Sequence, residues 1–478
     1  MKRFFGIDFG TTSSAVVETI VDAGSLRQIK YGVGSGVPFP SVVAINKKTG
    51  ETIAGLDVKK NLENLGGECE IIYSIKTNLD NDNCRVVANK EWFPEDVAAE
   101  LFCSLKKIVK ERTEEDLTEA VVSIPIGFSA EKRKHLRKAA VMAGIVITSF
   151  VSEPTAAFFS NYDALKSATN IVVFDWGGGT LDVSILRNEN GKIYEISKAG
   201  KNIAGDFIDN KIAKHIHAKV SLEKKIEARF EDVSFSAQDK MRVACEQAKI
   251  RLSEQDSSAV NILNYDQYGI VRTALDYKTF AELIAPEIKM AMGCVNEALH
   301  QAELGKSSVD RILLVGGSSK LRALKEAMVA EFGDRVFIPE NPEWDIAEGA
   351  SLLALQGGSN FSNQSVGMVI SDGSYYEFLA KNTALKDWKR NFRFAITDSS
   401  DFAQFAFAGS PDILSMQSRF RTLEIPAYGF LQEKIEVAAS VDEDLVFRVT
   451  AKSDRKSRNE KMTWEYENLK CYYKLPSK

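Results

Sequence analysis

Two short segments of this sequence place an acidic residue, glycines and a hydroxyl directly after an apolar strand. Residues 5–12 contain Asp8, and residues 174–180 contain Asp175. Glycine-rich bends allow backbone N–H groups to surround phosphate oxygens, and carboxylates hold Mg²⁺ through its water shell. Neither bend opens a helix, as a P-loop or a dinucleotide-binding turn does. Each leads into a second alternating strand, so the pair predicts a duplicated domain that clamps a polyphosphate from two sides.

Length and composition describe a globular chain with more than one domain. The 478 residues are too many for a single core, and the 44% hydrophobic and 27% charged fractions are ordinary for such proteins. A net charge of -5 disfavours binding to a nucleic-acid backbone. No stretch approaches the ~20 apolar residues of a membrane span, and Asp8 interrupts any signal-peptide core. We therefore expect a cytoplasmic protein that binds neither nucleic acid nor membrane.

The hydrophobic pattern divides the chain into three parts. Residues 1–357 alternate between strands and helices, which predicts an α/β domain. Residues 358–364 are rich in Gly, Ser and Asn and predict a linker. Residues 365–478 contain short alternating runs separated by turns, which predict an antiparallel β-sandwich. In the first part we expect strands at 3–8, 13–19, 120–124, 171–175, 181–187 and 311–315, and helices at 94–111, 129–143, 205–219, 236–253, 277–303 and 319–332. In the third part we expect strands at 375–379, 392–396, 402–407, 434–441 and 445–451.

A third glycine turn, at residues 313–319, stands between a strand and a helix. The order of the three turns resembles the actin-like, or ribonuclease-H-like, ATPase superfamily, whose duplicated domain has two lobes. More closely, the sequence resembles the 70-kilodalton heat-shock chaperone family. The segments that carry this resemblance are 6–12, 123–128, 152–157, 174–184, 205–210, 244–249, 315–319 and 341–343. Residues 365–368, 379–383, 435–437 and 448–452 resemble the peptide-binding β-domain of the same family.

The resemblance implies a catalytic group that hydrolyses ATP with Mg²⁺. Its members are Asp8, Lys76, Glu153, Asp175, Thr180 and Asp182. Asp8 and Asp175 would hold the metal ion through water, and Lys76 would stabilise charge on the transferred phosphoryl group. Glu153 would orient the attacking water, and Asp182 would assist through water. Without the resemblance, Lys76 would be taken for a surface residue, and Glu153 for a helix N-terminal acid that the helix dipole favours.

The resemblance also implies a set of groups that bind ATP or ADP. They are Gly10, Thr11, Thr12, Gly177, Gly178, Gly179, Thr180, Gly205, Glu246, Lys249, Ser253, Gly316, Gly317, Ser318, Lys320 and Glu343. The family stacks adenine between two arginines, whereas this sequence has Ile250 and Lys320 at those positions. Only a guanidinium is planar, so we expect weaker or altered nucleotide affinity rather than loss of hydrolysis. Arg251 could substitute only if its helix is locally rotated.

Two departures from the family concern how nucleotide and peptide binding are linked. The family's linker is a run of leucines with acidic flanks, whereas residues 356–364 contain Phe361 and no leucine. We therefore expect that coupling to the nucleotide state, and stimulation by a J-domain, differ from those of the family. The sequence ends at Lys478, directly after the β-domain, so we expect no helical lid. A bound peptide should then leave quickly, because affinity differences appear mostly in the off-rate.

The apolar side chains that could line the peptide groove of the β-domain have two possible interpretations. Met368, Ile370 and residues 402–407 are candidates for its lining. The same side chains are equally reasonable as sandwich core, because a slip of one residue moves a whole strand's side chains to the opposite face.

Three functions fit these observations. The first is an ATP-hydrolysing chaperone without a lid that binds unfolded, extended polypeptide segments. The second is a divergent co-chaperone or scaffold that binds ATP with little hydrolysis and docks a dedicated protein partner. The third is a sugar kinase of the same superfamily, which residues 152–157 and the β-sandwich disfavour. The complete catalytic group favours the first function.

Overall fold

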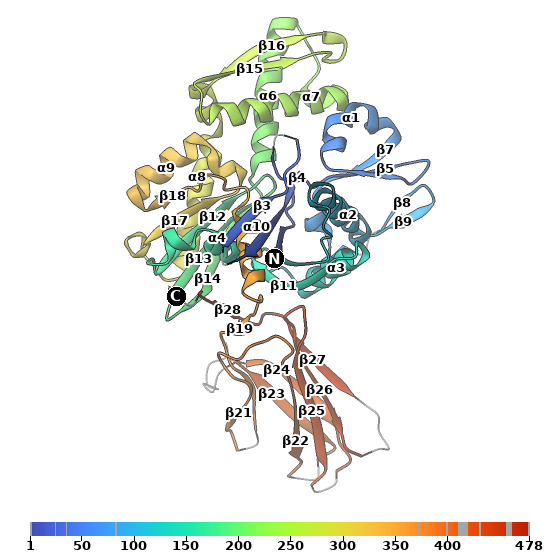
Figure 1. Cartoon of the computed structure of the whole chain (residues 1–478), viewed down its shortest axis with the longest axis vertical. Helices are drawn as coiled ribbons and strands as arrows, with labels where there is room; N and C mark the ends of the chain where they lie inside the picture. The colour runs from blue at the N-terminus through green and yellow to red at the C-terminus, as the bar shows by residue number, and fades with distance from the viewer. Residues whose placement is uncertain are drawn as a thin grey trace. The chain divides into compact units, whose positions relative to one another are not determined.

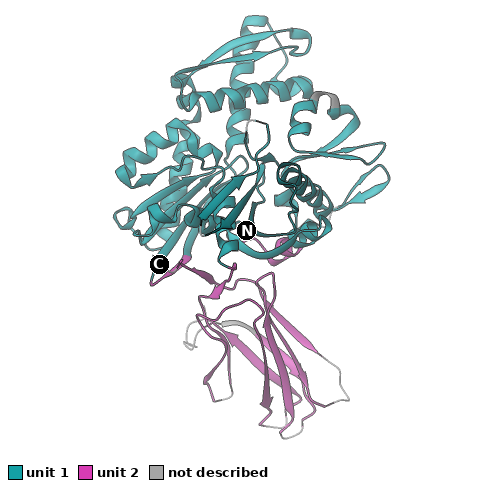
Figure 2. Cartoon of the chain, viewed as in Figure 1, with its two compact units in different colours: residues 1–126, 135–189, 195–356 teal, residues 127–134, 190–194, 357–478 magenta. Residues whose placement is uncertain are grey.

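The computed structural model describes residues 2–23, 25–34, 36–81, 84–370, 372–397, 400–409, 419–429, 432–455 and 461–476. The chain forms two compact units (Figure 2). Unit 1 comprises residues 1–126, 135–189 and 195–356, and unit 2 comprises residues 127–134, 190–194 and 357–478. Across the described ranges, no helix is both long and apolar enough to cross a membrane.

The first sheet of unit 1 is built around the strand that precedes Asp8. Its strand order is β11-β10-β1-β2-β3, with β2 and β3 antiparallel to their neighbours and β10 and β11 parallel to theirs. Figure 1 labels the two outer strands of this order, β3 and β11. The strands are β1 (Lys2–Asp8), β2 (Ser13–Asp22), β3 (Ser25–Lys30), β10 (Glu119–Ile124) and β11 (Val146–Ser152). The bend at residues 9–12 is therefore the hairpin that joins β1 to β2.

A second sheet repeats this plan around the strand that precedes the other bend. In unit 1 it runs in the order β18-β17-β12-β13-β14, with β12 antiparallel to β13 and parallel to β17, and with β17 parallel to β18. The strands are β12 (Asn170–Trp176), β13 (Leu181–Glu189), β14 (Lys192–Lys201), β17 (Arg311–Val315) and β18 (Val336–Phe337). The expected duplicated α/β fold of the actin-like type is confirmed.

Ten helices, counted over the described residues, accompany these sheets. They are α1 (Leu56–Glu68), α2 (Pro94–Thr113), α3 (Ala130–Met142), α4 (Glu153–Ser160), α5 (Tyr162–Leu165), α6 (Gly205–Lys224), α7 (Phe235–Leu252), α8 (Tyr277–Gln301), α9 (Arg322–Phe332) and α10 (Asp345–Leu355). The expected helices agree except near their ends. The one expected at 319–332 begins only at Arg322, because residues 317–320 form a 3-10 turn.

Smaller β elements complete unit 1. They are β4 (Phe39–Pro40) beside β2, the sheet of β5 (Val43–Asn46), β6 (Thr52–Ala54) and β7 (Cys69–Ile72), and the hairpins β8 (Arg85–Val87) with β9 (Lys90–Trp92) and β15 (Ser257–Ile262) with β16 (Val271–Asp276). The strands β4 to β9 are too short for the period-2 pattern to stand out in the sequence.

Helix α10 packs closely against both β1 and α4, and two glycines make this possible. A Cβ atom on Gly349 would lie 1.7 Å from the carbonyl oxygen of Ala156 in α4, and one on Gly6 would lie 2.2 Å from the amide nitrogen of Ser351. Any larger residue at either glycine would force the elements apart. The position of α10 is therefore fixed by backbone contact.

Unit 2 contains the expected antiparallel sandwich. Its sheets run β21-β20-β23-β24 and β22-β25-β26-β27. The strands are β20 (Val366–Val369), β21 (Tyr375–Leu379), β22 (Lys389–Ala395), β23 (Phe402–Ala408), β24 (Arg419–Pro426), β25 (Lys434–Val441), β26 (Phe447–Ser453) and β27 (Met462–Tyr466). Phe407 and Trp464 stack in the core with ring centroids 4.0 Å apart. Strands β20, β24 and β27 were not expected from the sequence.

A short strand pair lies beside the sandwich within unit 2. Strand β19 (Phe361–Ser362) pairs with β28 (Cys471–Lys474), and the Phe361 ring stacks on Tyr472 at 5.4 Å. Residues 361–362 of the expected linker thus adopt β structure. The boundaries 1–357, 358–364 and 365–478 stay predictions.

Candidate functional site

The two aspartate–glycine bends lie face to face in unit 1. A Cβ atom on Gly178 would lie 2.7 Å from the Thr12 hydroxyl oxygen, and one on Gly179 would lie 2.8 Å from the Thr11 methyl group. Residues with side chains at these glycines would collide with the opposite bend. The bends, which come from separate sheets, therefore form the two walls of one site.

A cavity of about 1280 Å³ opens between these walls. The sequence-predicted residues that line it are Asp8, Gly10, Thr11, Thr12, Lys76, Glu153, Asp175, Gly177, Gly178, Gly179, Thr180, Gly205, Glu246, Lys249, Ser253, Gly316, Gly317, Ser318, Lys320 and Glu343. Asp182 lies behind it and lines a second cavity of about 20 Å³ together with Glu153 and Asp175. The structure thus brings together all the residues that the resemblance selected.

An ion pair inside the cavity joins two residues that are distant in sequence. The Lys76 ammonium lies 2.5 Å from a carboxylate oxygen of Glu153, and the two residues are only 4% and 8% exposed. Glu153 is the first residue of α4, whose N-cap is Ser152. Lys76 is therefore a buried residue rather than a surface one. Glu153 pairs with Lys76 in addition to lying at the helix N-terminus, where the helix dipole favours an acid.

Burial and mutual repulsion shape the charges of this group. Burial raises the pKa of Asp8, against the effects of Lys76 and of a hydrogen bond from Ser123 (2.7 Å). Burial likewise raises the pKa of Glu153 to about 7, and burial together with the neighbouring carboxylates raises the pKa of Asp175. Burial alone would lower the pKa of Lys76, but Glu153 and Asp8 outweigh it. The charge of the Lys76 ammonium therefore acts on three carboxyl groups, and it forms an ion pair with that of Glu153.

This donor set fits a hydrated magnesium ion. Asp8 and Asp175 supply the hard oxygen atoms that Mg²⁺ prefers, and a cation beside them would stabilise their charged forms, which burial disfavours. Among the described residues, no three His, Cys, Asp or Glu side chains come close enough to bind a metal ion directly. A metal ion held through its own waters is consistent with such an arrangement.

The first turn of α6 supports the second bend. The amide of Gly205 donates to the carbonyl of Gly177 (3.1 Å), and the Ser318 hydroxyl donates to the same carbonyl (2.8 Å). The α6 helix points its N-terminus toward the cavity, where the helix dipole favours anions. The bend is thus held by one backbone and one side-chain hydrogen bond, which come from two other segments.

Asp209 is a site residue that the sequence reasoning missed. Its carboxylate lies 2.7 Å from the Lys249 ammonium, and both residues are buried. Burial raises the pKa of Asp209 to about 7, while Lys249 opposes the shift. No local pattern marks Asp209, because its partner Lys249 lies on another helix.

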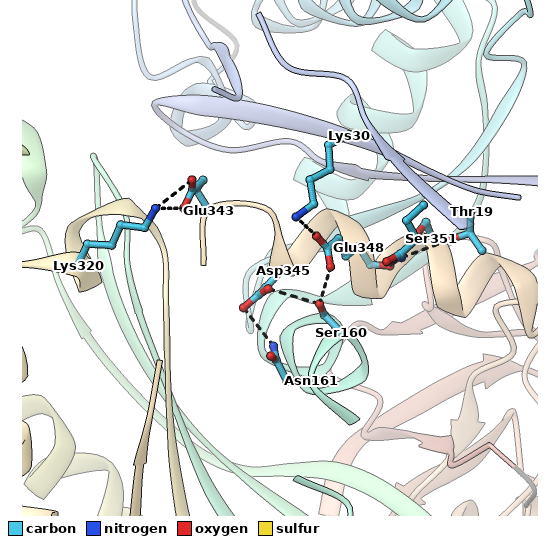
Figure 3. Close-up of polar contacts among 10 residues, drawn as sticks. Thr19, Lys30, Ser160, Asn161, Lys320, Glu343, Asp345, Glu348 and Ser351 are labelled. Atoms are coloured by element: carbon cyan, nitrogen blue, oxygen red, sulfur yellow. Dashed lines mark hydrogen bonds and ion pairs between the residues drawn. The ribbon is translucent and has the colours of Figure 1, made fainter. Parts of the chain in front are cut away.

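The end of the cavity that the resemblance assigns to the adenine base differs from a double arginine stack. The Lys320 ammonium forms an ion pair with Glu343 at 2.8 Å (Figure 3), and Ile250 is 53% exposed at the cavity wall. Arg251 instead donates to the Ser258 hydroxyl at 2.8 Å, so it does not replace either arginine. A nucleotide base at this end would contact the aliphatic side chain of Ile250 and the ammonium of Lys320.

In unit 2, most candidate groove residues belong to the sandwich core. Met368, Phe405 and Phe407 are buried in that core, and Ile370 packs against it half-buried. Phe402, at the start of β23, is 48% exposed. The strand register thus favours the core interpretation for Met368, Ile370, Phe405 and Phe407, whereas Phe402 and Gln404 are exposed.

Two α/β sheets of the same plan, each contributing one bend to a shared cavity, define the actin-like class of ATPase domain, here followed by a β-rich region. The family model described as Hsp70 protein matches residues 4–470, and the chain belongs to this family. Members of the family are ATPases that bind nucleotide, generally with Mg²⁺, and they bind unfolded polypeptides.

Proposed function

We propose that this chain binds ATP with Mg²⁺ in the cavity of unit 1, hydrolyses it, and binds extended polypeptide segments through unit 2. The observation that carries the proposal is the face-to-face contact of the two bends, with the Lys76–Glu153 ion pair lining the same cavity. An enzyme that transfers a phosphoryl group to water needs such donors and charges in fixed positions.

Each part of the site has a role in this proposal. Backbone N–H groups and hydroxyls of residues 10–12 and 177–180 bind the phosphates. Asp8 and Asp175 would hold Mg²⁺ through its waters, and the ion would supply positive charge to the phosphate oxygens. Lys76 stabilises the charge that develops on the transferred group, and its pairing with Glu153 holds both side chains in place. Glu153 orients the attacking water with help from Asp182.

Nucleotide affinity in this proposal is lower than a double arginine stack would give. Ile250 covers the purine with aliphatic surface, and Lys320 is partly engaged by Glu343. A lysine lacks the planar cation that stacks on a base. Affinity is altered more than the rate of hydrolysis, because neither residue belongs to the catalytic group.

Two sheets with edge strands support a polypeptide site in unit 2. Among the described residues, the edge strands of the two sheets are β21, β24, β22 and β27. An extended peptide can pair with such an edge through its backbone, while side-chain pockets give specificity. Exposed Phe402 and Tyr376 supply apolar surface on the first sheet.

A single-turnover assay with radiolabelled ATP tests the catalytic part. Wild-type protein should convert bound ATP to ADP, and Lys76→Met should slow this step about a hundredfold while still binding ATP. Lys107→Met is the matched control, because Lys107 is 75% exposed on α2, and it should match the wild type. Tight ATP binding without turnover in the wild type would instead identify the scaffold function. Release of a fluorescent unfolded peptide, with and without ATP, then reports whether the nucleotide state is coupled to unit 2.

A further inference from the structure

The first turn of α10 is connected directly to the purine end of the nucleotide cavity. Glu343, which pairs with Lys320, precedes the start of the helix at Asp345 by two residues. The carbonyl of Pro342 accepts a hydrogen bond from the Gly316 amide at 3.0 Å, and both residues line the cavity. A shift of this first turn would therefore move two parts of the cavity wall.

A polar cluster, which we call the α10 cluster (Lys30, Ser160, Asn161, Asp345 and Glu348), holds this turn against the end of α4 (Figure 3). Asp345 is 4% exposed and accepts from the Asn161 amide at 3.1 Å and from the Ser160 hydroxyl at 3.4 Å. The same hydroxyl lies 3.1 Å from a carboxylate oxygen of Glu348, whose other oxygen lies 2.5 Å from the Lys30 ammonium.

The number of protons in the α10 cluster limits its hydrogen bonds. A hydroxyl has one proton, so Ser160 can donate to Asp345 or to Glu348 but not to both at once. An uncharged Asp345 can donate its own proton to Ser160, which then donates to Glu348. An ionised Asp345 competes with Glu348 for the one proton, and the two negative charges repel each other across one helical turn.

The charges that act most strongly on Asp345 come from two elements. Glu348 acts from the same helix and Lys30 from β3, while Ser160 at the end of α4 and Asn161, between α4 and α5, are neutral. Burial raises the pKa of Asp345 to about 7, the bond from Asn161 opposes this, Glu348 adds to it, and Lys30 lowers it again. The carboxyl therefore changes charge near neutral pH.

We propose that Asp345 is a positioning residue of the nucleotide site, and that ATP binds more tightly when this carboxyl is uncharged. The uncharged form completes the chain of hydrogen bonds from Asp345 to Lys30 and fixes the segment that carries Pro342 and Glu343. The ionised form loosens that segment. This inference depends on the proposed nucleotide function of the cavity.

The test compares dissociation constants of a non-hydrolysable ATP analogue with Mg²⁺ from about pH 5.5 to about pH 8.5 by calorimetry. Asp345→Asn keeps the shape of the side chain and removes its titration. It should bind like the wild type at the acidic end and about fivefold more tightly than the wild type at the alkaline end. Asp163→Asn is the matched control, because Asp163 is exposed on α5 and pairs only with Lys166 at 2.7 Å among the described contacts; it should follow the wild type throughout.

Lys30→Met provides a second readout that a purely structural role would not change. Because Lys30 lowers the pKa of Asp345, its removal should move the alkaline loss of affinity to higher pH. The proposal is overturned if Asp345→Asn follows the wild type at every pH, or if Lys30→Met leaves the midpoint unshifted. If Asp345→Asn fails to fold, the pH midpoint of the affinity loss in Lys30→Met decides whether the proposal stands. A wild-type protein that binds no nucleotide at any pH would overturn the proposed function itself, and this proposal with it.

Discussion

Replacement of Lys76 by methionine should destabilise unit 1 in a pH-dependent manner. Methionine keeps most of the side-chain volume but removes the charge that pairs with Glu153 at 2.5 Å. Removing one partner of a buried ion pair costs about 3 kcal/mol or more, because the other charge is left without compensation. We therefore expect the free energy of unfolding to fall by about 3 kcal/mol near pH 8.

The pH dependence follows from the pKa of Glu153. Burial already raises this pKa to about 7, and Lys76 opposes the shift, so the variant should have a still higher value. When the pKa of a carboxyl is raised in the folded state, the free energy of unfolding falls as pH rises from the unfolded-state pKa to the folded-state pKa. In the wild type the contribution of Glu153 stops falling near pH 7, whereas in the variant it continues to fall above that pH, so the difference in stability between them should grow with pH.

Urea unfolding near pH 6 and near pH 8, followed by the helical circular dichroism signal, measures this difference. Adding Glu153→Gln to the Lys76 variant should restore most of the lost stability near pH 8, since the uncompensated charge is gone. The exposed-site control Lys107→Met should change stability by less than about 0.5 kcal/mol. A Lys76 variant as stable as the wild type near pH 8, or one equally destabilised at both pH values, would refute the reasoning.

Three further substitutions test other contacts. Gly178→Ala should weaken ATP binding at least about tenfold by calorimetry, since its Cβ atom would strike the opposite bend. Gly177→Ala should change the affinity far less, because a Cβ atom there would lie 3.8 Å from its nearest neighbour, the carbonyl oxygen of Thr180. Gly349→Ala should cost about 3 kcal/mol in urea unfolding because it pushes α10 off α4; Gly293→Ala, within α8 and facing open space, should instead add about 0.5 to 1 kcal/mol. Ile250→Arg should tighten ATP binding about fivefold by stacking on the base; unchanged affinity would show that the purine lies elsewhere.

The duplicated fold could be predicted because its signal is local. Each central strand is a continuous apolar run that ends in an aspartate, and the glycines that follow mark the hairpin. The local sequence around Asp8 and Asp175 is therefore enough to assign them equivalent positions in two sheets. The long helices were equally visible, because their periodic apolar faces extend over several turns.

The contacts across the cavity could not be predicted in this way. Lys76 and Glu153 lie in different elements, and nothing in the residues around Lys76 shows that it is buried. Asp209 was missed because its partner Lys249 lies on another helix. In the sandwich, the alternation of β23 fits either face, and only the strand pairing shows that Phe405 and Phe407 face the core. Such features depend on tertiary packing rather than on local pattern.

The proposed function requires both bends to bind the same triphosphate. A crystal structure of the protein with Mg²⁺ and a non-hydrolysable ATP analogue measures this directly. We expect the phosphates to contact backbone amides of residues 10–12 and of residues 177–180 at once, with the metal ion near Asp8 and Asp175. An analogue bound to one bend alone, or found outside this cavity, would contradict the account.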